Sequence, residues 1–116
     1  MKLREILAYE AEKLAYELVL IGVLCDQLIT RYCLRHPLMY EANPYTLWNM
    51  EHGLWIPIDV AIIAAMIGIP FILIRRWGFK GRHTLLLGPM TYGSLRLITA
   101  VFNINNYLIA IMLMPI

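Results

Sequence analysis

Three long apolar stretches set the pattern of this chain. The clearest is segment 54–74, LWIPIDVAIIAAMIGIPFILI, in which Asp59 is the only charged residue. A helix needs about 20 predominantly apolar residues to cross a hydrocarbon layer of roughly 30 Å. Segments 18–35 and 89–114 have a comparable length and a more polar composition. The pattern therefore predicts an all-α integral membrane bundle of three transmembrane helices.

The segment before the first predicted span has a different pattern. Over residues 1–17, apolar residues recur every three or four positions and charged residues occupy the other faces. This periodicity predicts an amphipathic N-terminal helix. Because neither glycine nor proline interrupts the chain before residue 18, we expect this helix to continue directly into the first span.

Two polar connections separate the predicted spans within a single membrane domain, 1–116. The outer connection, 36–53, contains two prolines, one of them in an Asn-Pro pair, and both favour turns. The second connection, 75–88, is basic, and Gly88 with Pro89 should redirect the chain before the third span.

Composition and charge support the membrane interpretation and exclude other functions. Sixty per cent of the residues are hydrophobic and the mean hydropathy is +0.63, beyond the usual apolar share of a soluble domain. The net charge of +2 is too small for a surface that binds polyanions. We therefore predict no specific nucleic-acid site.

The distribution of Lys and Arg predicts the orientation. Seven of them lie in the N-terminal helix and the second connection, and two lie at the outer end of the first span: Lys2, Arg4, Lys13, Arg75, Arg76, Lys80 and Arg82 against Arg31 and Arg35. Positive residues are retained on the cytoplasmic side of a membrane. We expect a multi-pass protein of the cell membrane with a cytoplasmic N-terminus.

The basic connection also suggests a lipid partner. Arg75, Arg76, Lys80 and Arg82 would attract anionic headgroups, each contributing about 1 kcal/mol near a charged leaflet. Alternatively, these residues only set the orientation.

Three ionisable residues, Asp26, Asp59 and Arg96, fall inside the predicted spans. Each would cost about 2.5 to 3.5 kcal/mol against lipid, so we expect them to face inward and pair. Counting about 1.5 Å per residue along each helix places Asp26 and Arg96 level, as an intramembrane ion pair. The same count places Asp59 about two turns nearer the outside, where it would pair with another subunit, a terminal amide or water. The predicted polar neighbours of the pair are Gln27, Thr30, Asn103 and Asn106.

These charges allow two functional interpretations. In the first, the ion pair fixes which helix faces which, and the protein packs as a subunit. In the second, Asp26, Asp59 and Arg96 handle protons or ions in transport. The second interpretation requires polar groups through to the basic side, and the sequence IIAAMIGIPFILI at 62–74 offers none.

The outer connection holds the residues that suggest a metal: His36, Glu41, Glu51 and His52. Their spacing matches no metal-binding pattern with a mechanistic basis. No histidine lies inside a predicted span to ligate haem, and no nucleophile has a base at a readable spacing. We predict no catalytic residue, metal or cofactor, and keep a metal-dependent membrane enzyme as the weaker alternative.

A short motif gives one family resemblance. Asp26 and Thr30 form D-x-x-x-T, and Glu41, Asn43 and Pro44 form E-x-N-P. This pattern resembles small three-span prokaryotic membrane proteins of unknown function, the DUF5658 type. The resemblance implies a three-span fold, with Asn103 or Asn106 as the polar residue of the third helix, but no activity. The chain departs from the pattern where that family often has a Lys early in the second span and this one has Asp59.

The E-x-N-P motif also has a local physical meaning. Asn43 before Pro44 is held extended and can close an Asx turn, while the Glu41 carboxylate can accept from free amides at a helix start. We expect the motif to fold the outer connection onto the bundle as a cap, or to receive a ligand there.

The predicted function is that of a non-enzymatic structural or accessory subunit in a homo-oligomer or a larger membrane assembly. The small residues Ala61, Ala64, Ala65 and Gly68 would let another helix approach the second span closely. Two apolar helices around a basic connection also resemble conjugation-type pilins, which implies a membrane-derived filament subunit as a specific version of this function.

Overall fold

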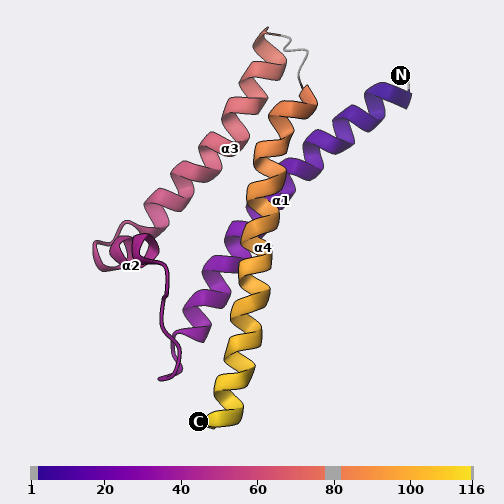
Figure 1. Ribbon diagram of the computed structural model, residues 1–116. Coiled ribbons are helices and arrows are strands. Elements are labelled where there is room, and N and C mark those ends of the chain that lie inside the picture. The colour runs from indigo at the N-terminus through magenta and orange to yellow at the C-terminus, as the bar shows by residue number, and fades with distance from the viewer. Residues whose placement is uncertain (1–2, 78–81, 116) are drawn as a thin grey trace.

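The computed structural model describes residues 3–77 and 82–115, which form four helices (Figure 1). They are α1 (Leu3–Cys33), α2 (Pro44–Glu51), α3 (Trp55–Trp77) and α4 (Arg82–Leu113). Within these described ranges the chain contains no strand. The predicted all-α class is therefore confirmed.

α1 is one uninterrupted helix of 31 residues. The expected N-terminal helix and the first predicted span are thus continuous, and the helix ends at Cys33, two residues before the predicted boundary. The absence of glycine and proline before residue 18 explains this continuity, because no residue there disfavours helical backbone.

α4 corrects the prediction that Gly88 and Pro89 redirect the chain. The helix runs from Arg82 through Pro89 to Leu113 without a break. A proline inside a helix removes one backbone hydrogen bond, to the carbonyl four residues earlier. Pro89 is fully buried, so the packing of its ring against the rest of the protein offsets this loss.

α2 is a helix within the segment that the sequence predicted only as turns. Asn43 adopts extended backbone (φ −82°, ψ 114°), and its side-chain oxygen accepts from the amides of Tyr45 (3.0 Å) and Thr46 (3.5 Å). Pro44 occupies the first turn, where its missing N–H is not needed. The predicted Asx turn is confirmed, and it serves as a helix N-cap. α2 ends at Glu51 with His52 as its C-cap, and Gly53, with φ +69°, follows before α3.

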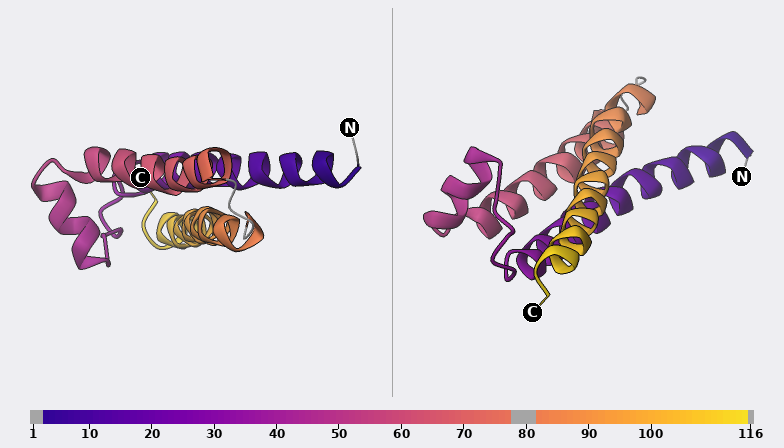
Figure 2. Two further views of the ribbon diagram at one scale, coloured as in Figure 1. Left: turned by 90° about the horizontal axis from the view of Figure 1, so that it is seen from above. Right: turned by 60° about the horizontal axis from the view of Figure 1, so that its bottom comes forward.

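The tightest packing lies where α1 and α4 cross. Figure 1 shows α4 passing over α1, and the views in Figure 2 place α1 and α3 in one layer with α4 in a second. Gly22 and Gly93 face each other at the crossing, and a Cβ on Gly93 would lie 2.5 Å from the Leu18 carbonyl. Ala15, Val19 and Val23 of α1 are buried beside it. The missing side chains thus allow the two backbones to touch.

Within the residues that the structure describes, two helices are long and apolar enough to cross a membrane: α3 over Trp55–Arg76 and α4 over Thr84–Leu113. Only 11% of each apolar window is buried within the protein. α1 does not meet the same criterion in the described part of the chain.

No helix of the described ranges packs on the small residues of α3. Ala61, Ala64 and Ala65 are exposed, and a Cβ on Gly68 would meet nothing within 4 Å. The close helix approach within the described chain uses the two glycines of α1 and α4 instead. The prediction that another molecule packs on the α3 face remains a prediction.

Candidate functional site: a buried ion-pair network beside a cavity

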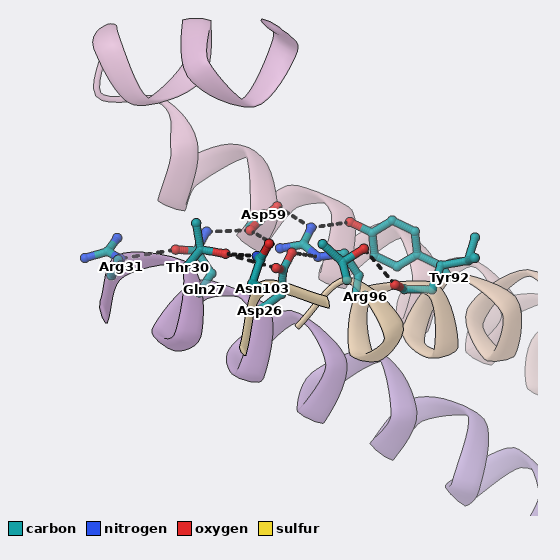
Figure 3. Close-up of polar contacts among 10 residues, drawn as sticks. Asp26, Gln27, Thr30, Arg31, Asp59, Tyr92, Arg96 and Asn103 are labelled. Carbon is teal, nitrogen blue, oxygen red and sulfur yellow. Dashed lines mark hydrogen bonds and ion pairs between the residues drawn. The ribbon is translucent and has the colours of Figure 1, made fainter. Parts of the chain in front are cut away.

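The three ionisable residues predicted to lie within the spans meet at one place (Figure 3). Arg96 of α4 lies between Asp26 of α1 and Asp59 of α3. Its Nε is 2.6 Å from Asp26 Oδ2. Its two terminal nitrogens donate to the two oxygens of Asp59, at 3.1 and 2.8 Å. One guanidinium thus joins the three long helices.

The position of Asp59 corrects the depth count. The count assumed straight helices that start level and stand parallel, and it placed Asp59 two turns away from Arg96. In the structure α4 begins before Gly88 and crosses α1 at an angle (Figure 1). These two features bring Arg96 within reach of both carboxylates, and no other subunit is needed to pair Asp59.

Polar side chains surround the ion pairs. Thr30 donates to Asp26 Oδ1 (3.1 Å) and accepts from Asn103 Nδ2 (3.0 Å). Gln27 donates to Asp59 Oδ2 (2.5 Å) and accepts from Arg31 Nε (3.3 Å). Three of the four predicted polar neighbours therefore join the network. The fourth, Asn106, is exposed and lines a neighbouring cavity instead.

Tyr92 is a further member of the network, and it was not among the predicted residues. Its hydroxyl accepts from Arg96 Nη1 at 2.8 Å, and its ring lies 5.7 Å from the guanidinium carbon. The two residues are four positions apart on one helix, the spacing at which side chains meet. The sequence therefore contained a signal for this contact, a tyrosine four positions before Arg96.

Burial makes the network energetically significant. The side chains of Arg96, Asp26 and Asp59 are 16%, 14% and 9% exposed. Two carboxylates share one guanidinium, so the formal charge of the three is −1. Arg96 Nε contacts the Asp26 carboxylate and no other polar group of the described residues. Removal of one member would leave an uncompensated buried charge.

A cavity of about 350 Å³ adjoins the network. Asp26, Asp59 and Arg96 contribute to its wall, together with Glu41 and Asn43 of the outer connection. Glu41 Oε1 accepts from the Asn43 amide at 3.0 Å, as the motif predicted. The E-x-N-P segment thus lies against the network and leads from it into α2 at Pro44.

A second cavity of about 500 Å³ shares Glu41, Asn43 and Asn103 with the first. Its remaining wall is largely apolar and includes Leu34 of α1 and Ile109 of α4. The two cavities therefore lie next to each other and share part of their wall, and the first has a charged lining while the second has a largely apolar one.

A separate ion pair joins α1 and α3 near the N-terminal end of the molecule. Arg75 Nη1 contacts Glu12 Oε1, and the Tyr16 hydroxyl donates to the same oxygen at 2.9 Å. Burial and the hydrogen bond to Glu12 raise the pKa of Tyr16 to about 12. Beside this pair, Ala15, Ile74 and Leu86 form a buried apolar cluster.

The predicted headgroup-binding residues are only partly described. The guanidinium of Arg75 is engaged by Glu12 and lies over the Phe71 ring at 4.1 Å, and Arg76 is exposed. Lys80 lies outside the described residues, and Arg82 is the first residue of α4. Their binding of lipid remains a prediction.

The two histidines of the outer connection contact backbone. His36 is buried, its Nε2 lies 2.8 Å from the Met114 carbonyl, and its Nδ1 accepts from the Leu38 amide at 3.2 Å. This pattern fits a neutral ring with its proton on Nε2, which ties the end of α1 to the end of α4. His52 Nδ1 contacts the Trp48 carbonyl at 2.8 Å. Among the described residues, no three His, Cys, Asp or Glu side chains are grouped to hold a metal ion.

The architecture that these observations define is an all-helical chain with two helices capable of crossing a membrane and a charged network between three helices. Comparison with protein-family models, with curated proteins and with solved structures finds no match to this chain. The resemblance to the DUF5658 type therefore remains a prediction based on its two short motifs.

Proposed function

We propose that this protein is a non-enzymatic integral membrane subunit whose three long helices cross the membrane and pack into a homo-oligomer or a larger assembly. The observation that carries the proposal is an inverted distribution of polarity. Charged residues pair in the interior, while large apolar side chains such as Leu28, Val60 and Val101 are 58% to 67% exposed. Such a surface suits lipid or neighbouring apolar helices rather than water.

The same reasoning supports α1 as a third span. Its polar residues Asp26, Gln27 and Thr30 are satisfied by α3 and α4, so they would not face lipid. Its outward positions include Leu24 and Leu28, both more than half exposed. A helix whose polar groups all find protein partners can cross a bilayer despite modest overall hydropathy.

The orientation is part of the proposal. The N-terminus and the end of α3 lie at one end of the molecule, and the end of α1 and the C-terminus lie at the other (Figure 1). This arrangement supports an N-terminus and a basic connection that share the cytoplasmic side. The exposed small-residue face of α3 supports contacts with further subunits, as in a membrane-derived filament.

A second candidate function is the handling of protons or cations. The formal charge of −1 on Asp26, Asp59 and Arg96, together with the adjoining cavity, favours this function. Against it, the stretch of α3 between Asp59 and Arg75 carries only apolar residues and glycine. A conducting path would require polar groups along that stretch.

The experiment has two stages. The protein should remain in membranes washed with alkaline carbonate, and native mass spectrometry in mild detergent should then give the mass of an oligomer or of a complex with another membrane protein. Release by carbonate would contradict membrane insertion, and a lone monomer would contradict the subunit role. Flux measurements on two sets of vesicles, one with wild-type protein and one with Asp59→Asn, test the second function. A proton or cation flux that is present with the wild type and lost with the variant would favour transport.

A further inference from the structure

Two adjoining cavities, which together we call the hollow, lie among the outer connection and the three long helices and place a charged lining beside an apolar one. At the charged end, Asp26, Asp59, Glu41 and Arg96 line the cavity of about 350 Å³. At the other end, Leu34, Leu38, Ile109 and Leu113 line the cavity of about 500 Å³. This combination suits an amphiphile, which needs a polar contact for its head and an apolar contact for its tail.

The charged end carries a net negative charge. Three carboxylates and one guanidinium give it a formal charge of −2. The guanidinium of Arg96 is already shared by Asp26, Asp59 and Tyr92, so it is not free for an anionic group. The Glu41 carboxylate, by contrast, accepts one hydrogen bond, from Asn43, and a carboxylate has about four acceptor positions. Charge complementarity therefore favours a head that carries N–H donors and a positive charge.

The surroundings favour a lipid as the source of this head. Tyr40, Trp48 and Trp55 lie on the outer connection and at the start of α3, and such aromatic residues gather at the headgroup level of a bilayer. Arg31 stacks over Trp55 at 4.9 Å, and Trp55 lines the charged cavity. A cation thus lies beside a residue of the cavity wall, on which the phosphate of a zwitterionic lipid could bind.

We propose that this hollow binds an aminophospholipid of the outer leaflet, with its ammonium group at Glu41 and one acyl chain along Leu34, Ile109 and Leu113. The inference rests on the proposed membrane insertion. It assigns to the E-x-N-P segment a role beyond capping α2, since Glu41 would contact the ligand while Asn43 holds the helix start.

The test compares headgroups on the purified full-length protein by native mass spectrometry. Phosphatidylethanolamine should bind about tenfold more tightly than phosphatidylglycerol, which lacks the ammonium, because a charge-assisted hydrogen bond contributes at least that factor. Phosphatidylcholine, whose nitrogen has no N–H, should bind more weakly than phosphatidylethanolamine. Equal affinity for the three lipids would overturn the proposal.

Matched variants locate the site. Glu41→Gln keeps an acceptor for the Asn43 amide and should abolish the preference for phosphatidylethanolamine, whereas Glu51→Gln, on the exposed end of α2 and outside both cavities, should retain it. Thr99→Phe should fill the junction of the two cavities and weaken binding of all three lipids. Val101→Phe, on an exposed face of α4, should not. If Glu51→Gln and Val101→Phe had the same effects as their counterparts, the site would be refuted.

Two controls separate the possible failures. Ethanolamine without a tail should not compete with the lipid at equal concentration, and effective competition would contradict the use of the apolar groove. If the protein stays in carbonate-washed membranes but shows no headgroup preference, only the lipid site fails. If it is released by carbonate, the membrane proposal fails and the lipid site fails with it.

Discussion

The contact between α1 and α4 and the attachment of α3 are built on different physics. α1 and α4 touch backbone to backbone at Gly22 and Gly93, next to fully buried Ala15 and Val19. α3 is held mainly by charged side chains: Asp59 pairs with Arg96, Arg75 pairs with Glu12, and Arg31 of α1 lies over Trp55. Its apolar contact around Ile74 is limited. Between these points its small residues face outward.

The difference shows how a small chain can hold three helices together without a large core. Shape complementarity at a glycine crossing acts only at short range and tolerates no added atom. Ion pairs between long side chains span a wider gap, and in a low-dielectric environment they strongly penalise the loss of a partner. The first contact therefore fixes the α1–α4 geometry, and the second fixes the position of α3 relative to it.

Removal of Arg96 should have the largest effect on this arrangement. Arg96→Met leaves Asp26 and Asp59 as unpaired buried carboxylates, so we expect a loss of about 3 to 5 kcal/mol in the free energy of unfolding. Denaturant titration in detergent micelles, followed by circular dichroism, measures it. A triple variant with Asp26→Asn and Asp59→Asn added should recover much of the loss. A triple variant as unstable as Arg96→Met would show that charge is not the cause.

A methyl group at the glycine crossing should have the next largest effect. Gly93→Ala places a Cβ 2.5 Å from the Leu18 carbonyl, and such overpacking costs about 1 to 3 kcal/mol or more. The same titration reports the loss of stability. Gly68→Ala on α3 is the control, because its Cβ would meet nothing within 4 Å. It should be neutral or slightly stabilising, and equal losses at the two positions would contradict a tight α1–α4 crossing.

Loss of the α2 cap should have a smaller and local effect. Asn43→Ala removes the acceptor for the Tyr45 and Thr46 amides and should destabilise the start of α2 by about 1 kcal/mol. Hydrogen exchange of amides 45–47 should accelerate, while amides around Gly22 stay protected. Asn43→Asp should preserve the cap. Faster exchange at the α1–α4 crossing would show that the cap holds the whole bundle.

The smallest effect concerns the pH dependence at the Glu12–Arg75 contact. The pKa of Tyr16 is raised to about 12 by burial and by the hydrogen bond to Glu12. The unfolded chain therefore loses this proton first, so the contribution of Tyr16 to stability is present below pH 10 and is lost as the pH rises from 10 to about 12. When the free energy of unfolding is plotted against pH, wild type and Tyr16→Phe should differ in slope only between pH 10 and about 12. An identical slope would contradict the shift.

Some features follow from the sequence because they depend on residues close together in the chain. The uninterrupted run of helix formers predicts the continuous α1, and the Asn43-Pro44 pair predicts the Asx turn that caps α2. The cost of charge in an apolar segment predicts that Asp26 and Arg96 turn inward. In each case the cause lies within one helix or one turn.

Other features depend on how the helices lie against one another, and these only the tertiary structure decided. The crossing of α1 and α4 places Gly93 on the backbone of α1. The position of α3 beside these two helices brings Asp59 to Arg96, against the depth count, and brings Arg75 to Glu12, 63 residues away in the chain. Helix offsets arise from side-chain shape summed over an interface. The charge pattern therefore indicated that each buried charge needed a partner, but only the packing of the helices determined which partner it has.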